Sequence, residues 1–205
     1  MWLLLNGRPT RLPRVFARAR MAIMDQKSLT IAFLVPTEAD HWANRLTARA
    51  SEHPFCHTEI FFESLNQCFS IVWGETACFR AKNLSNPNYR LVSLAVAPKE
   101  YDLCLEFCRS ISAQHLKFDD WGMWRSWFPQ PLVCTCCDRS SGLKGRTFCS
   151  KIITEALQHA GVREVEALLP SATTPSVLYK AVAPSSRVIC CGVPVKRQAL
   201  LRCLG

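Results

Sequence analysis

The residues with the clearest potential for chemistry are a histidine and a glutamate two positions apart, His57 and Glu59. They lie in 56–63, a segment rich in β-formers, and side chains two residues apart on a strand point to the same face. Their Cβ atoms would then be about 6 to 7 Å apart. A carboxylate at that distance can hold an imidazole in one tautomer, directly or through a water molecule. Taken alone, the pair fits a charged sheet face equally well.

A cysteine, Cys149, stands in the first turn of the strongest predicted helix, 148–159. Thr147 is expected to cap this helix, and Gly161 is expected to follow its end. Unpaired N–H groups and the dipole at a helix start lower a thiol pKa. Cys149 also continues the apolar stripe of the helix, so its sulfur is expected to face the sheet. A thiolate there that meets a histidine is the arrangement of a cysteine hydrolase. The competing interpretation is a small buried hydrophobic residue.

A third polar residue would orient the imidazole, and three candidates are open. Glu59 is favoured because it shares the strand face with His57. Ser70 is the alternative on the next predicted strand, although a serine orients an imidazole weakly. Glu63 lies four residues beyond Glu59, near the turn. The hairpin register decides among them, and the sequence leaves that register open.

The pattern over residues 27–183 predicts an α+β domain, a small antiparallel sheet with helices packed on it. Strands are predicted over 29–35, 56–63, 68–73, 91–96 and 188–195. Helices are predicted over 38–50, 99–116, 119–127 and 148–159, with a last short helix opening at Pro175 after Thr174. Periodicity is lost over 129–146, which predicts a loop or insertion.

The order of these segments resembles the circularly permuted branch of the papain-like, NlpC-type cysteine hydrolase superfamily, which includes YaeF/YiiX-like proteins and the lecithin:retinol acyltransferase group. In that branch the histidine strand precedes the cysteine helix. The matching stretches are 29–35, 56–62, 68–70, 118–121, 148–162 and 170–179. The resemblance covers 29–183 and implies a permuted papain-like fold with the nucleophile at a helix N-terminus. The loop 130–146, the N-terminal arm and the tail after Pro184 depart from the family pattern.

We therefore predict a thiol enzyme that acts on an amide, thioester or ester. It is either a peptidase- or amidase-like hydrolase or an acyltransferase. His57 would take the proton of Cys149, an acyl-enzyme would form, and the backbone N–H of Cys149 would stabilise the oxyanion. The expected partner is a peptide, amide or lipid-ester substrate, and no cofactor is expected. One alternative is a lipid acyltransferase or phospholipase with the same residues. The others are a catalytically inactive binding domain and a nucleic-acid-binding basic protein.

The charge is concentrated at the N-terminus of the 205-residue chain, whose formal net charge is +9. Residues 1–30 hold six Lys and Arg and one acid, net +5, which leaves net +4 for the remainder. We predict a basic extension without stable structure over 1–26 and a basic tail over 184–205. Three interpretations of the extension are open: a solvated tail, a mitochondrial-type targeting segment, or an arm that binds nucleic acid or an anionic membrane.

The twelve cysteines are poorly spaced for disulfides, since 136–137 and 190–191 are adjacent pairs. Without a signal peptide this indicates reduced thiols in an intracellular compartment, most simply the cytoplasm. Cys134, Cys136 and Cys137 invite a zinc interpretation, but no second ligand pair lies near them, so no metal is expected. Apolar runs stay well below the roughly 18 to 20 residues that span a bilayer, and no transmembrane helix is expected.

Overall fold

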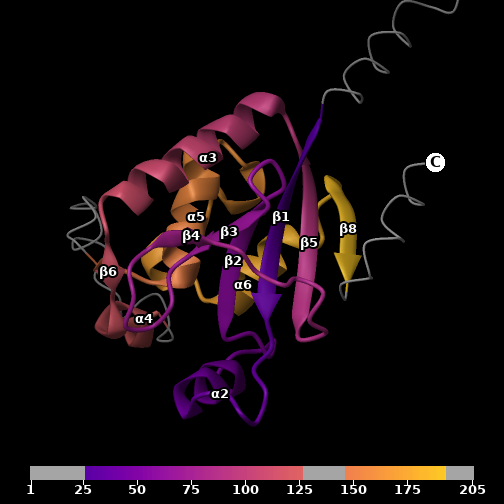
Figure 1. The fold of residues 1–205 in the computed structure, drawn as a ribbon. Coiled ribbons are helices and arrows are strands. Elements are labelled where there is room, and N and C mark those ends of the chain that lie inside the picture. Colours follow the sequence, from indigo (N-terminus) through magenta and orange to yellow (C-terminus); the bar gives the residue numbers. More distant parts are fainter. Residues whose placement is uncertain (1–25, 127–145, 193–205) are drawn as a thin grey trace, which may run out of the picture.

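The computed structural model describes residues 26–126 and 146–192. These residues form an α+β fold whose main sheet has six strands in the order β4-β3-β2-β1-β5-β8, every neighbouring pair antiparallel (Figure 1). Its strands are β1 (Lys27–Leu34), β2 (His57–Phe62), β3 (Gln67–Ser70), β4 (Cys78–Arg80), β5 (Tyr89–Val96) and β8 (Val188–Gly192). The predicted α+β class and antiparallel sheet are confirmed.

The helices are α2 (Trp42–Arg49), α3 (Pro98–Ala113), α4 (Asp120–Arg125), α5 (Cys149–His159) and α6 (Pro175–Val182). Helices α3 and α5 pack on each other, and α5 also packs on β2 and β3. Two short strands, β6 (Lys117–Phe118) and β7 (Arg146–Thr147), form a separate parallel pair. No helix of the described ranges is long and apolar enough to cross a bilayer.

The core follows the strand alternation. On β1 the alternating residues Leu29, Ile31 and Phe33 are completely buried, and Ile31 lies opposite Ile60 of β2. The matching stripe of α5 is apolar and completely buried, and consists of Ile152, Ile153, Ala156 and Leu157. Burial of this stripe against β2 and β3 sets the position of α5 on the sheet.

The start of α5 differs from the prediction by one residue. The cap is Phe148, in extended conformation and without a capping side chain, and the predicted cap Thr147 is wrong. Thr147 is instead paired with Phe118 in the β6–β7 ladder. This pairing keeps the backbone extended for one residue more. The helix end is as predicted, with Gly161 at φ +80° just beyond the last turn.

Several other boundaries follow local chemistry. The helix predicted over 38–50 begins only at Trp42, because Asp40 first closes a turn by accepting from the backbone N–H of Thr37 at 2.6 Å. The opening of α6 is confirmed, with Pro175 in its first turn and the Thr174 hydroxyl accepting from Val177 N–H at 3.3 Å. The short strands β4, β6 and β7 were not predicted, because two or three residues carry no readable period.

Part of the sequence prediction falls outside the described residues. This holds for the basic extension up to residue 25, for most of the predicted insertion with Cys134, Cys136 and Cys137, and for the chain beyond Gly192. Within the region predicted as a C-terminal tail, β8 joins the main sheet beside β5.

Candidate active site

His57 is the first residue of β2, and its position is set from both sides. Its backbone pairs with Leu34 of β1. The preceding residue, Cys56, donates its backbone N–H to the carbonyl of the same Leu34 at 2.9 Å. Pro54 stands just before this segment and disfavours a helical conformation at His53. The imidazole is therefore carried by a backbone that is tied to the central strand.

Glu59 lies on the same side of β2 and is fully buried. Its Oε1 lies 3.2 Å from His57 Nε2, 3.3 Å from Lys82 Nζ and 3.4 Å from the Tyr89 hydroxyl, which donates to it. The same-face expectation for His57 and Glu59 is therefore met. Burial acts to raise the pKa of Glu59, but His57 and Lys82 outweigh it and lower that pKa to about 2. The carboxylate is an anion at every ordinary pH.

Cys149 opens α5, and its side chain is buried in the core cluster beside Phe148. Burial acts to raise the thiol pKa. The charge of His57 and its hydrogen bond to the sulfur outweigh burial, and the backbone N–H groups of Thr58 and Ser150 act in the same direction, so the pKa is lowered. Because Phe148 supplies no capping side chain, the first-turn N–H groups remain available to the sulfur or to a bound oxyanion.

His57 and Cys149 thus interact electrostatically although they lie far apart in the chain. Burial acts to lower the pKa of His57, but Cys149 and Glu59 together raise it to about 9. A raised imidazole pKa and a lowered thiol pKa together favour a thiolate–imidazolium pair at neutral pH. The order Cys149–His57–Glu59 is that of a nucleophile, a base and an orienting carboxylate.

The other two candidates for the third polar residue are not in this constellation. Ser70 is buried on β3, and the β2–β3 register, in which Ile60 pairs with Phe69, sets it across from Glu59 rather than from His57. Glu63 is exposed at the turn, beyond the opposite end of β2 from His57. Glu59 is therefore the candidate that lies beside the imidazole.

Two contacts of the site, Lys82 and Tyr89, were missed by the sequence prediction. Lys82 lies in the loop between β4 and β5, and Tyr89 opens β5, two residues before the predicted strand start. No local pattern marks either residue, since each reaches Glu59 only through the sheet order. A lysine and a tyrosine on one buried carboxylate oxygen hold it against rotation.

The pKa of Cys149 is shifted in the opposite direction from the pKa values of three other buried thiols, Cys56, Cys68 and Cys108. Burial raises the pKa of Cys56 to about 12 and also raises the pKa values of Cys68 and Cys108. Among the described cysteines with a shifted pKa, only Cys149 is shifted downward. Within residues 26–126 and 146–192, no group of three or more metal-binding side chains is found.

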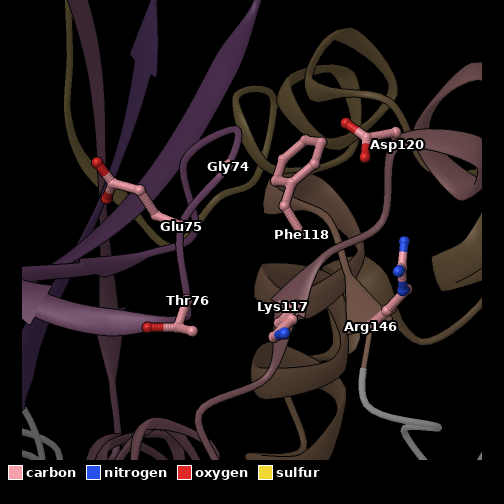
Figure 2. A pocket seen from close by; sticks show the side chains of 7 residues that line it. All are labelled: Gly74, Glu75, Thr76, Lys117, Phe118, Asp120 and Arg146. Atoms are coloured by element: carbon pink, nitrogen blue, oxygen red, sulfur yellow. The ribbon is translucent and has the colours of Figure 1, made fainter.

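A surface pocket of about 280 Å³ lies beside β6 and β7 (Figure 2). It is lined by Gly74, Glu75, Thr76, Lys117, Phe118, Asp120 and Arg146. Neither His57 nor Cys149 lines it, although Arg146 precedes Cys149 by only three residues. Figure 2 shows the aromatic ring of Phe118 between the turn at Gly74 and the Asp120 carboxylate. The pocket therefore borders the segment that leads into α5.

Known proteins give no independent guide to this site. No protein-family model, no curated protein and no solved structure matches the chain.

Proposed function

We propose that the chain is a cysteine-dependent hydrolase or acyltransferase that cleaves an amide, thioester or ester through an acyl-enzyme on Cys149. The observation that carries this proposal is a helix-start thiol on α5, which packs on β2, whose pKa is lowered by an imidazole of β2 that lies 3.2 Å from a buried carboxylate. Buried cysteines ordinarily have raised pKa values, as Cys56 has here. A thiolate is costly in a buried site unless cationic and hydrogen-bonding partners compensate, and this arrangement is typical of a nucleophile.

In the proposed reaction the Cys149 thiolate attacks the carbonyl carbon, and a C–S bond forms as the carbonyl oxygen becomes an oxyanion. The backbone N–H of Cys149 donates to that oxyanion, a contribution of about 2.7 to 4 kcal/mol for one donor. The leaving amine, alcohol or thiol takes the proton of the His57 imidazolium as its bond to carbon breaks. His57 then removes a proton from water or another acceptor, whose attack releases the acyl product and restores the thiolate.

We further propose that the domain has the permuted papain-like fold which the sequence resembles. The order of elements supports this, because the strand with His57 precedes the helix with Cys149 and an antiparallel sheet packs on that helix. The substrate is then a peptide, amide or lipid ester, the classes that the resemblance implies.

The experiment is competitive labelling of the native full-length protein with iodoacetamide at pH 7, followed by peptide mapping. Cys149 should be alkylated before the other thiols, and His57→Ala should slow its labelling at least tenfold. The exposed cysteines Cys190 and Cys191 are the internal reference, because access alone favours them. Uniform labelling, or labelling that peaks at residues 134–137, would overturn the proposal.

A further inference from the structure

A group of aromatic side chains is exposed on one end of the domain. We call it the aromatic surface and define it as His41, Trp42, Trp73, Trp121 and Trp124. Of these, Trp42, Trp73 and Trp121 are 55%, 40% and 72% exposed. Folded proteins bury most of the surface of their tryptophan side chains. Three tryptophans that are 40% or more exposed therefore need an explanation.

Ring contacts join these residues into one continuous surface. The His41 ring lies 5.5 Å from that of Trp42 and 5.2 Å from that of Trp73. Trp42 in turn stacks on Trp124 at 6.4 Å, which connects α2 to α4. Trp121 stands three residues before Trp124 and therefore shares its side of α4. Three segments distant in sequence thus contribute to one aromatic area.

Cations flank the aromatic surface. Helix α2 carries Arg45 and Arg49 beside the exposed Leu46 and contains no acid, and Arg125 ends α4. None of these three arginines forms an ion pair with another described residue. Within the described residues, the surface therefore combines apolar rings with three arginines that form no ion pair.

The aromatic surface also adjoins the candidate active site. Trp73 follows β3 at the end of the sheet where β2 begins with His57. On the other side, Asp119, which caps α4, donates its backbone N–H at 2.7 Å to the carbonyl of Thr147, two residues before Cys149. Figure 1 shows α2 standing clear of the sheet at this end of the molecule.

We propose that the aromatic surface docks the domain on an anionic lipid bilayer. Tryptophan favours the headgroup region, where its ring is buried and its N–H stays hydrated, and arginines are attracted to anionic lipids. Docking of a folded domain requires apolar side chains on a projecting element with cations around them, as α2 provides. The proposal concerns described residues of the domain and not the basic extension, and it does not depend on the chemistry of Cys149.

The test is flotation of the full-length protein with vesicles of phosphatidylcholine alone and of phosphatidylcholine mixed with phosphatidylserine. Wild-type protein should bind at least tenfold better to the vesicles with phosphatidylserine. Trp42→Ser with Trp121→Ser should lower that binding at least tenfold. Arg45→Gln with Arg49→Gln should lower it severalfold on the anionic vesicles. Circular dichroism and the thermal midpoint verify that each variant is folded.

Matched controls come from the other sides of the domain. Ile189→Ser removes an apolar side chain that is 48% exposed on β8, and Arg109→Gln removes an exposed arginine of α3. Both variants should bind as wild type does. Cys149→Ala should also bind normally, which separates this proposal from the proposed catalysis.

Two outcomes overturn the inference. If the wild-type protein does not float with anionic vesicles, the aromatic surface has another occupant, such as a protein partner. If the double tryptophan variant floats as well as wild type does, bilayer binding belongs to the basic extension instead.

Discussion

Lys82 and Glu59 form an ion pair in which Lys82 Nζ lies 3.3 Å from Glu59 Oε1. The same carboxylate oxygen lies 3.2 Å from His57 Nε2. Glu59 is fully buried, so its charge depends on these cations for compensation. The electrostatic interactions of the candidate site therefore extend from Cys149 through His57 and Glu59 to Lys82, which lies in the loop between β4 and β5.

If Cys149 and His57 act as one unit, their losses will not add. Cys149→Ala and His57→Ala should each abolish turnover of an amide, thioester or ester substrate, and the double variant should be no worse than either. Glu59→Gln should cost less, because orienting an imidazole contributes less than supplying the base or nucleophile. Steady-state kinetics on the folded variants tests this. Additive losses from the two alanine variants would show that the residues act separately.

The pH dependence of alkylation follows from the lowered pKa of Cys149. Because a thiolate reacts and a thiol does not, the rate at Cys149 in the folded protein should decline less as pH falls from 9 to 6 than the rate at the same residue in the urea-unfolded protein. His57→Ala removes the neighbouring cation and should raise the apparent pKa of Cys149. Rates measured by mass spectrometry at each pH give both profiles. Parallel profiles for Cys149 in the folded and in the unfolded wild-type protein would contradict the expectation.

The buried carboxylate makes acid stability depend on Glu59. Its pKa is about 2 in the folded protein against an ordinary value of 4.5. A lowered folded-state pKa gives stability that is complete above pH 4.5 and is lost as pH falls toward 2. The difference amounts to about 3 kcal/mol at most. Denaturant unfolding between pH 7 and pH 2 measures this loss, and Glu59→Gln should show a shallower dependence on pH over the same range.

Lys82→Met should move the acid transition. It keeps the aliphatic stem and removes a cation that lowers the pKa of Glu59, so that pKa should rise and stability should begin to fall at higher pH. At pH 7 the expected loss is about 1 to 2 kcal/mol. Lys117→Met is the matched control, since Lys117 is exposed and forms no ion pair with another described residue. Equal unfolding curves for the two variants would argue against a role of Lys82.

Residues 1–24 should be dispensable for folding. They lack periodicity and precede β1, which begins at Lys27. A protein that starts at Asp25 should keep the cooperativity of the thermal transition, with its Tm within a few degrees of that of the full chain. Differential scanning calorimetry of both chains is the measurement. A broad, non-cooperative transition in the shorter chain would show that the extension packs on the domain.

Local rules were enough to predict several features from sequence. The two-residue spacing places His57 and Glu59 on one side of a strand, because β-strands alternate. The apolar period over 148–159 and the glycine at position 161 predict a helix that starts near Cys149 and ends near His159, as observed. Each of these features depends only on neighbours within a few residues, so the sequence of one segment is enough to predict it.

Only the tertiary structure decided which of these residues meet. His57 and Cys149 come together because α5 packs on β2. Ser70 does not lie beside His57, because the β2–β3 register sets it across from Glu59. Lys82 joins them through the sheet order. Each contact spans segments that are separated in sequence, and its free energy comes from burial shared by whole elements, which no local pattern encodes.

The same distinction holds at the start of α5 and at the aromatic surface. With Thr147 as its cap the helix would begin at Phe148, but it begins at Cys149 because Thr147 is paired with Phe118 of β6. Trp42, Trp73 and Trp121 look like core residues when each is read in its own segment. They form one exposed area only because α2, α4 and the turn after β3 converge at one end of the sheet. Solvent exposure is a property of the assembled surface, so composition and periodicity could not predict it.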